Sequence, residues 1–511
     1  MEPIQIVYNA VAAKVVNPNQ TVDLSLQQIL SYHVAGYEQT DAYQTGAWDG
    51  RSSFYEMRHH RFPSGFVPIV HRSLTNLGFK VSLRRKPLPP PRGPEKPEVD
   101  KFGYDDERYA YQLDTTAQLV KHGRMIAQVA TGGGKSRIAQ IATARIGRPT
   151  LFLTTRKVLM YQMQVHFQNM IAEMGKYHPS VKGKPVGVLG DGDWEPKGWI
   201  NVGMVQTIAA RLKQPSSSDA PAKQKAQMNR IAKTRELLER FEFVILEEAH
   251  EASGNSYYDI LKRCKNAEYR LALTATPFMK DDEEANMNLM ACAGPIGIRV
   301  SEKQLIDSGI LAKPYFKYLT PYPKPKYLLR TTGWGPAYRL GIVENTSRNA
   351  LILREAIMGH KAGLSVLVLV KQKKHGKLLE QAFKNNGMRT KFIFGESTRK
   401  VRTAALNALE KGELDVLIGS NILDVGVDVP ALGMVILAAG GKAEVELRQR
   451  IGRGLRAKKK GGNVAFVVDF NDKWNKHLQK HSLARRNIVK ATPGFCENIL
   501  PDGEEFPYEL L

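Results

Sequence analysis

The chain has 511 residues, of which 42% are hydrophobic and 8% aromatic, which excludes a disordered chain and is enough for about two to four globular domains. No apolar run approaches the length of a transmembrane helix. The three cysteines, Cys264, Cys292 and Cys496, have no paired spacing and no neighbouring His/Cys cluster, which argues against structural zinc and disulfides and fits a reducing cytosol. The 74 Lys and Arg against 50 Asp and Glu give a formal net charge of +24, which favours a polyanionic partner, although a solvated basic surface would give the same charge.

A small α+β N-terminal domain is predicted for residues 1–95. Its end overlaps a proline- and charge-rich segment, RRKPLPPPRGPEKPEVDK (84–101), which cannot sustain a helix or a central strand. We interpret this segment as a semi-rigid linker that ends near residue 103. The chain beyond it is therefore expected to fold separately.

Beyond the linker, short apolar runs alternate with helical patterns. Strands are predicted in PTLFLTT, WINVGMV, FEFVILEE and YRLALTATP, and again in LSVLVLV, RTKFIF, LDVLIGS, GMVILAA and NVAFVVDF. Continuous Val, Ile and Leu runs bounded by turns are typical of parallel strands buried on both faces. The sequence therefore predicts an α/β protein with two consecutive parallel-sheet domains, 104–317 and 318–511.

Two segments of these domains have an ambiguous role. Residues 211–235, rich in Ser, Pro, Ala and Lys, form either a solvated insertion or a DNA-contacting loop, and their second half favours a basic helix. The tail 472–511 changes from basic to acidic. It either docks on the second domain or contacts a partner.

The segment QVATGGGKSRIAQI joins a possible short strand to a helix with apolar periodicity. Consecutive glycines allow backbone N–H groups to wrap an anion, and the helix N-terminus adds partial positive charge. In a phosphate-binding loop of this kind, Lys135 reaches the β- and γ-phosphates of ATP and Ser136 places its hydroxyl on magnesium. The full pattern requires a glycine where this chain has Val129, so a purely structural turn stays an alternative.

The second half of an ATP site is an acid at the end of a later strand, and FVILEEAH supplies it. Glu247 and Glu248 alternate across a strand end, so that one can orient magnesium while the other takes a proton from water. A solvated acidic turn is the alternative. That alternative loses weight because the two motifs occur together and in this order.

Two further segments carry polar side chains that suit a nucleotide site. LALTATP ends another strand with Thr274 and Thr276, whose hydroxyls either link the nucleotide site to the interdomain cleft or cap the next segment. ELRQRIGRGLR places Gln449, Arg453 and Arg456 on one face if it is helical. That face suits phosphate contact between domains, and as a lone feature it would equally suit a solvated surface.

The ordered series YQ, TGGGKS, VILEEAH, LTATP, GSNILDVGVDVP and QRIGRGLR resembles the motifs of superfamily 2 helicases over about residues 105–470. Six motifs in order and at strand ends are far more specific than any one of them. The resemblance implies two tandem RecA-like domains, with ATP bound in the cleft and nucleic acid lying across both.

The resemblance also implies which residues bind and hydrolyse ATP. Gln112 would read adenine, Glu247 would assist magnesium and Glu248 would be the catalytic base. The phosphates and metal would be held by Thr131, Gly132, Gly133, Gly134, Lys135 and Ser136. The second domain would contribute Gly426, Asp428, Gln449 and the arginine fingers Arg453 and Arg456.

The resemblance implies coupling and nucleic-acid contacts as well. The residues that couple the two sites would be His250, Thr274 and Thr276. The nucleic-acid backbone would be contacted by Gln162, Thr207, Ser420 and Arg399.

A narrower similarity, to phage branch-migration helicases of the UvsW type, is carried by GY, GAWDGR, FPSGFV and LGFKV near the N-terminus, with LIDSGILAKPYF and NTSRNALI further on. It implies a phage replication, recombination and repair enzyme that acts on forked or four-way DNA in the cytoplasm of the host bacterium. In the N-terminal domain, stacking and phosphate contacts would come from Tyr37, Trp48, Arg51, Phe54, Arg58, His59 and Arg61. Alternatively, the aromatic residues form the small core of that domain and only the charges are exposed.

We favour an ATP- and Mg²⁺-dependent DNA helicase or translocase that acts on single-stranded, forked or four-way DNA. A monomer is favoured, and phage replication and recombination proteins are candidate partners. An RNA helicase is one alternative, because a similar acidic motif occurs there. A non-hydrolysing nucleic-acid clamp is another, suggested by Glu247 in place of the family's usual Asp. The extra methylene moves that carboxylate by ~1.5 Å, so we expect Glu247 to hold magnesium through a water.

Overall fold

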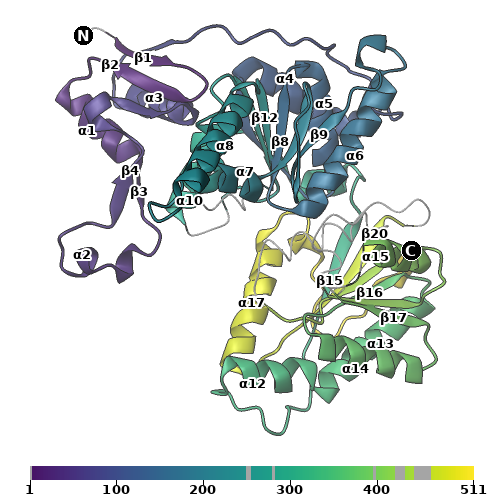
Figure 1. The fold of residues 1–511 in the computed structure, drawn as a ribbon. Helices are drawn as coiled ribbons and strands as arrows, with labels where there is room; N and C mark the ends of the chain where they lie inside the picture. The colour runs from purple at the N-terminus through teal and green to yellow at the C-terminus, as the bar shows by residue number, and fades with distance from the viewer. Residues whose placement is uncertain are drawn as a thin grey trace. The chain divides into compact units, whose positions relative to one another are not determined.

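The computed structural model describes residues 3–248, 255–278, 282–394, 397, 399–420, 432–441 and 462–511. They divide into two compact units, Met1–Val129 with Gly134–Arg299, and Ala130–Gly133 with Val300–Leu511. Each unit is built around its own large sheet (Figure 1). None of the helices in the described ranges is long and apolar enough to cross a membrane.

The N-terminal part of the first unit folds around a small sheet with strand order β5-β2-β1-β6. Its strands are β1 (Ile4–Tyr8), β2 (Ala12–Val16), β5 (Arg61–Pro63) and β6 (Val81–Arg84), and a hairpin of β3 (Ser31–His33) and β4 (Arg51–Ser53) flanks the short helix α2 (Asp41–Gln44). Helices α1 (Gln20–Ile29) and α3 (Val67–Asn76) cover the sheet with apolar side chains such as Leu26 and Leu74. Asn19 starts α1 because its side chain accepts a hydrogen bond from the backbone N–H of Val22 at 2.9 Å.

This small sheet shares its core with helix α10 (Glu283–Ala293). A Cβ at Gly65 would lie 2.1 Å from the Met290 carbonyl oxygen, so only glycine permits this approach. The buried guanidinium of Arg124 donates to the Ser64 hydroxyl at 2.7 Å and to the Ala10 carbonyl at 2.9 Å. The N-terminal residues therefore pack on the rest of the unit through buried contacts.

The proline-rich segment is a strap fixed along the first unit. Tyr269 donates its hydroxyl to the Pro89 carbonyl at 2.7 Å, and the Gly93 N–H donates to the Arg145 carbonyl at 3.0 Å. A Cβ at Gly93 would lie 2.1 Å from the Ala144 carbonyl oxygen. The composition predicted stiffness but not attachment, because the partners lie far away along the chain.

The large sheet of the first unit has strand order β10-β9-β11-β8-β12-β13-β7-β14. Its strands are β7 (Arg124–Val129), β8 (Thr150–Thr154), β9 (Val186–Gly190), β10 (Asp193–Glu195), β11 (Ile200–Met204), β12 (Phe243–Glu247), β13 (Tyr269–Thr274) and β14 (Ile296–Val300). The strands from β9 to β7 in this order run parallel, and β10 is antiparallel to β9. Their apolar runs are buried, as the sequence predicts.

Helices cover this sheet on its faces (Figure 1). They are α4 (Ala110–His122), α5 (Lys135–Ile146), α6 (Lys157–Met174), α7 (Val205–Leu212), α8 (Pro221–Glu239), α9 (Asn255–Leu261) and α10. The basic helix expected within 211–235 is the first part of α8. This helix begins with exposed residues, and Ile231 and Thr234 further along it are buried.

The sheet of the second unit has six parallel strands in the order β15-β20-β19-β16-β18-β17. They are β15 (Lys313–Leu319), β16 (Val366–Leu369), β17 (Thr390–Ile393), β18 (Val416–Gly419), β19 (Met434–Ile436) and β20 (Val464–Phe470). The helices of this unit are α11 (Glu302–Asp307), α12 (Trp334–Tyr338), α13 (Thr346–Lys361), α14 (Lys373–Asn385), α15 (Arg399–Glu410) and α17 (Lys476–Ala491). Two α/β units with parallel sheets confirm the predicted fold class.

The C-terminal tail docks on this second sheet. Phe506 is buried against Phe466, with ring centroids 4.7 Å apart, and Glu505 pairs with the ammonium of Lys317. Of the two predicted alternatives, the structure therefore favours docking, and the acidic end of the tail neutralises a buried lysine.

Candidate nucleotide site and nucleic-acid contacts

A glycine-rich loop leads from β7 into α5. Gly132 and Gly134 adopt φ of 90° and 75°, a left-handed conformation that favours glycine. Helix α5 begins without a side-chain cap, so its first backbone N–H groups are not satisfied by a capping residue. Lys135, the first residue of α5, donates to the Val129 carbonyl at 3.4 Å. A loop of this geometry is suited to an anion such as phosphate.

Two carboxylates stand at the end of β12. Glu247 is the last residue of the strand and is 5% exposed, and Glu248 follows it at 8%. Glu248 has a φ of 49°, which is uncommon for a residue with a side chain and is typical of functional turns. The turn sends the second carboxylate in a direction that a continuing strand would not allow.

The polar end of β13 lies between these two features. β13 pairs with β7 on one side and with β12 on the other, and Glu247 stands in register with Leu273. Thr274 ends the strand, and its hydroxyl accepts a hydrogen bond from the Thr276 N–H at 3.2 Å. Because adjacent strands are about 4.8 Å apart, the glycine loop and the two carboxylates leave the same sheet edge roughly 10 Å from each other.

A cavity of 290 Å³ lies beside the start of α5. Its wall includes Gln112, Gly134 and Arg137, together with Phe102 and Tyr104 from the end of the strap. Gln112 is buried, and a Cβ at Gly134 would lie 2.5 Å from its amide nitrogen. Gln112, the predicted adenine-reading residue, therefore lies directly against the glycine-rich loop.

Arg137 fixes the amide of Gln112, a role that no sequence motif indicated. Its Nη1 donates to the Gln112 Oε1 at 2.7 Å, and its Nε donates to the Asp100 carboxylate at 2.6 Å. The guanidinium also lies over the Tyr104 ring, 5.1 Å from the centroid. Asp100 belongs to the segment predicted to be only a linker and Tyr104 follows that segment directly, so composition gave no signal for this contact.

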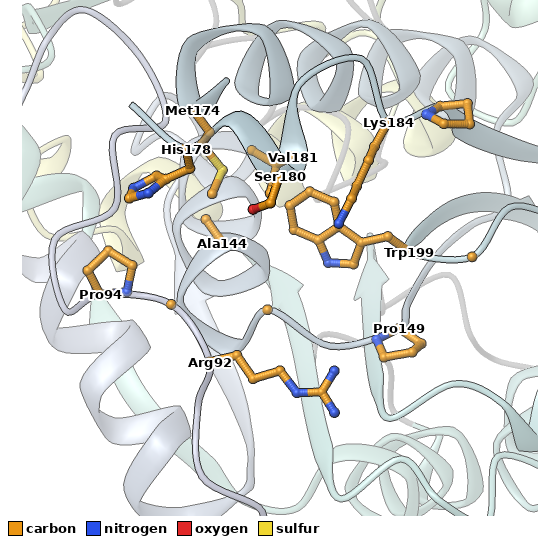
Figure 2. Close-up of a pocket in the computed structure, with 14 residues that line it drawn as sticks. Arg92, Pro94, Ala144, Pro149, Met174, His178, Ser180, Val181, Lys184 and Trp199 are labelled. Atoms are coloured by element: carbon orange, nitrogen blue, oxygen red, sulfur yellow. The ribbon is translucent and has the colours of Figure 1, made fainter. Parts of the chain in front are cut away.

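A larger cavity of 700 Å³ lies at the other end of α5 (Figure 2). Arg92, Pro94, Lys184 and Trp199 line it together with Ala144. The twelve residues of α5 span roughly 18 Å, and they separate this cavity from Lys135. Although this cavity is the larger of the two, its position separates it from the candidate nucleotide site.

The predicted nucleic-acid contacts of each unit also follow strand ends. Gln162 is half-buried in α6 after β8, and Thr207 is half-buried in α7 after β11. In the second unit, Ser420 is buried directly after β18, and Arg399 is the first residue of α15. The first pair shares an edge of the sheet with Glu247, because all three strands are parallel.

The N-terminal candidates fall into two groups. The Trp48 indole donates to the Arg51 carbonyl at 2.8 Å, and the Arg51 guanidinium contacts the His33 ring at 3.3 Å. Arg58 and Arg61 are exposed. The first group holds the hairpin together, whereas the second presents charge to solvent.

Of the aromatic residues predicted for the DNA surface of the N-terminal domain, Phe54 belongs to the core instead. The ring of Phe54 lies 5.2 Å from that of Phe66 and 5.8 Å from that of Tyr258. Tyr37 stacks on His33 with centroids 4.8 Å apart. Phe54 is therefore an internal packing residue rather than a surface for a base.

Six predicted site residues lie outside the described residues. They are His250, Gly426, Asp428, Gln449, Arg453 and Arg456. Their roles stay predictions. Within the described ranges, no cluster of three or more His, Cys, Asp or Glu side chains is arranged to hold a metal ion.

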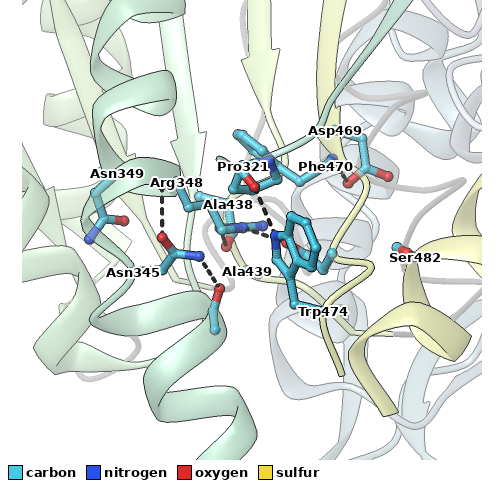
Figure 3. Close-up of polar contacts among 12 residues, drawn as sticks. Pro321, Asn345, Arg348, Asn349, Ala438, Ala439, Asp469, Phe470, Trp474 and Ser482 are labelled. Atoms are coloured by element: carbon cyan, nitrogen blue, oxygen red, sulfur yellow. Dashed lines mark hydrogen bonds and ion pairs between the residues drawn. The ribbon is translucent and has the colours of Figure 1, made fainter. Parts of the chain in front are cut away.

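Two buried arginines, Arg348 and Arg485, make ion pairs at the carboxyl edge of the second sheet, and Figure 3 shows the first of them. Arg348 is fully buried, pairs with Asp472 at 3.0 Å and donates to the Ala438 carbonyl at 2.8 Å. Arg485 pairs with Asp469 at 2.9 Å. Arg348 comes from the segment NTSRNALI, and its contacts explain why that segment carries a charge inside a core.

Two known families match the chain. Residues 106–279 match the family described as type III restriction enzyme, res subunit, and residues 348–458 match the helicase conserved C-terminal domain. Among known proteins, the chain is similar to the ATP-dependent DNA helicase UvsW of Enterobacteria phage T4, with 23% identity over 477 residues that cover 88% of this chain and 86% of that protein.

Two further likenesses are broader. The chain is 23% identical over 282 residues to the ATP-dependent RNA helicase DBP3 of Phaeosphaeria nodorum, covering 54% of this chain and 40% of that protein. The solved structure of the DUF1998 helicase MrfA bound to DNA and AMPPNP matches with a TM-score of 0.53 at 15% identity, covering 78% of this chain and 55% of that chain. The likeness to MrfA concerns the fold alone.

The fold of two parallel-sheet units and the two family matches define a nucleic-acid-dependent ATPase of the helicase class. Within that class, the chain resembles the superfamily 2 helicases and, over most of its length, UvsW.

Proposed function

We propose that the chain is an ATP-dependent DNA helicase or translocase that unwinds or branch-migrates forked and four-way DNA during phage replication, recombination and repair in the host cytoplasm. One observation carries the motor part of this proposal. Three neighbouring strands, β7, β13 and β12, deliver a glycine loop, two threonines and two carboxylates to one sheet edge. The DNA part is supported by the similarity to a DNA helicase and by the net charge of +24.

Phosphates of ATP would be held by the backbone of the loop Thr131–Gly134 and by Lys135. The left-handed glycines fit this group, because they turn successive N–H groups toward one side. Ser136, in the first turn of α5, and Glu247 would hold magnesium, which neutralises phosphate charge when bound.

Hydrolysis would depend on Glu248 as the base that takes a proton from the attacking water. Its left-handed backbone interrupts the alternation of the strand at this residue, and we propose different tasks for the two carboxylates. Arg453 and Arg456 of the second domain would stabilise the developing charge, and Thr274, Thr276 and His250 would couple the sites. The division into 1–95, 104–317 and 318–511 remains part of this proposal.

The decisive experiment compares ATPase rates of the full chain with single-stranded DNA, duplex, fork, four-way junction and RNA in parallel. We expect stimulation by DNA, strongest with branched substrates. Stimulation by RNA alone would replace the proposal with an RNA helicase, which the similarity to DBP3 keeps as the second candidate. A rate that no nucleic acid raises would refute both.

The N-terminal contribution is tested by substitution rather than deletion, because removing the domain would expose the core it shares with α10. Arg58→Gln combined with Arg61→Gln should weaken binding to a four-way junction. The slope of the binding constant against salt concentration, both as logarithms, should become shallower by about 2, the loss of roughly two phosphate contacts. Lys361→Gln with Lys411→Gln, at two exposed lysines of the second unit, is the control that removes the same charge. Junction affinity that is the same in the double variant and in the parent would remove the domain from the proposed DNA surface.

A further inference from the structure

The segment 320–333, between β15 and α12, exposes several large apolar side chains. Tyr322 is 78% exposed, Tyr327 71% and Leu329 60%. Single exposed apolar residues are ordinary, but two exposed tyrosines and an exposed leucine within eight positions of one loop are a concentration typical of an interaction surface. We call residues 320–333 the aromatic loop.

The aromatic loop is held in place by buried polar contacts at its base. The Trp474 indole donates to the Pro321 carbonyl at 2.8 Å (Figure 3). The fully buried Asn475 donates from its amide to the Leu329 carbonyl at 3.0 Å and to the Thr332 carbonyl at 2.8 Å. The exposed rings therefore stand on a fixed backbone, so that a partner does not have to order the loop when it binds.

A small core of its own supports the loop from below. Leu328, between the two exposed positions Tyr327 and Leu329, is buried at 1% in a cluster with Tyr338, Ile342 and Leu478. The alternation is informative, because burial of Leu328 accounts for the stability of the loop without Tyr322 or Tyr327. The ring of Tyr322 lies 6.4 Å from that of Trp474 and is still 78% exposed, so most of its surface stays open to a partner.

The charge around the rings has one sign. Lys324, Lys326 and Arg330 are exposed and form no ion pair within the described part of the chain. No Asp or Glu occurs between Asp307 and Glu344 in the sequence. Basic side chains interleaved with exposed aromatic rings fit a polyanion that also offers flat apolar faces.

The loop also starts at the sheet edge where α/β folds bind ligands. It follows the last residue of β15, and Ser420 follows the last residue of β18 in the same parallel sheet. Carboxyl ends of parallel strands lie at one edge. The aromatic loop therefore begins on the same edge of this unit as the predicted backbone contact Ser420.

We propose that the aromatic loop binds single-stranded DNA, with bases stacked on Tyr322 and Tyr327 and phosphates bound by Lys324, Lys326 and Arg330. Stacking requires unpaired bases, because the faces of paired bases are covered by their neighbours in a duplex. This inference rests on the proposed function, which makes DNA the substrate. It adds a contact surface on the second unit that none of the helicase motifs contains.

The test uses the full chain with Tyr322→Ala and Tyr327→Ala combined. Affinity for a labelled oligothymidylate should fall about 30-fold or more, since each of the two stacked bases contributes roughly a fivefold change or larger. Affinity for a blunt duplex should be unchanged. Tyr177→Ala, which removes a ring that is 60% exposed in the first unit, is the matched control and should leave both affinities at the parent value.

A second pair of measurements separates stacking from charge. An abasic oligonucleotide should bind the parent as weakly as oligothymidylate binds the tyrosine double variant. Lys324→Gln, Lys326→Gln and Arg330→Gln together should lower the salt slope of single-strand binding by up to about 2, at roughly 0.7 for each phosphate contact.

Two outcomes overturn the inference and spare the proposed function: equal oligothymidylate affinity in the parent and the tyrosine variant, or an equal loss for the blunt duplex. A parent whose ATPase no DNA stimulates would instead remove the proposed function itself. Melting temperatures of all variants check that the exposed substitutions leave the fold intact.

Discussion

The carboxyl edges of the two sheets are built from opposite kinds of residue. The first sheet leaves β7 through a loop of small residues with left-handed glycines and ends β12 in two carboxylates. At the second sheet, the turn after β19 is held by Arg348, whose charge is neutralised by Asp472. Small residues leave room for a bound anion, whereas the buried pair of Arg348 and Asp472 fills the space at the turn after β19, so the glycine loop is suited to ligand exchange and that turn to a fixed backbone.

The strongest test of this comparison is Glu248→Gln. Loss of the proposed base should lower kcat by about 1,000-fold while ATP still binds, and Lys135→Ala should weaken both binding and turnover. ATP hydrolysis and the binding of a fluorescent ATP analogue are measured side by side. Glu236→Gln, on the exposed surface of α8, is the control. Parent-like turnover in Glu248→Gln would show that the base is elsewhere.

At the second edge, Arg348→Met should cost stability rather than chemistry. Removing one partner of a buried pair leaves Asp472 charged and buried, which costs about 3 kcal/mol of the free energy of unfolding. Hydrogen exchange in peptides of the second unit locates the loss. Arg354→Met on the same helix, where half of the side chain is exposed, should cost under 1 kcal/mol, because its buried partner Glu355 keeps the ion pair with Lys317 at 3.2 Å. Equal losses in both variants would contradict the assigned role of Arg348.

Arg137→Met tests whether the strap participates in nucleotide binding. The Gln112 amide loses the donor that orients it, so KM for ATP should rise about tenfold with little change in kcat. Arg137→Lys should restore part of the effect. The exposed Arg108→Gln, whose ion pair with Asp106 lies at the rim of the same cavity, should leave KM near the parent value. A fall in kcat with an unchanged KM would show that Arg137 does not help to position the adenine base of ATP.

The buried His375 makes the second unit sensitive to acid. Burial, together with the nearby charge of Arg348, lowers the pKa of His375 from 6.5 to about 3. Because the unfolded chain binds the proton more readily, this contribution to stability is present above pH 6.5 and is lost as the pH falls toward 3. From pH 7.5 to 5.5 the loss is about 1.4 kcal/mol.

His375→Gln should remove that slope from chemical denaturation curves of the second unit. His360→Gln, which changes a half-exposed histidine in α13, is the control and should keep the slope. The same pH dependence in parent and His375→Gln would assign the acid sensitivity to other groups.

The smallest effect is expected from Glu247→Asp. A carboxylate that holds magnesium through a water tolerates a change of one methylene, so ATPase activity should stay within about twofold of the parent. Steady-state rates across a magnesium titration check this. An inactive Glu247→Asp beside an active parent would indicate direct ligation of the metal.

Local patterns were sufficient to predict the first edge. TGGGKS, LEE and LTATP each follow an apolar run, and parallel strands necessarily gather their carboxyl ends. The wall of the 290 Å³ cavity beside α5, which we propose to face the adenine, was not predictable in this way. Asp100 and Arg137 are far apart along the chain and belong to no shared motif, so only folding brings them to Gln112.

The sequence by itself determined the class of fold, the order of the helicase motifs and the basic character of the chain, because periodicity, glycine turns and charge are local or additive properties. Tertiary structure alone decided that the proline-rich segment is a strap, that Arg348 is buried and that Tyr322 and Tyr327 are exposed beside a buried Leu328. The reason is physical. Burial and pairing depend on neighbours contributed by distant segments, and those neighbours are set only when the sheets and helices pack.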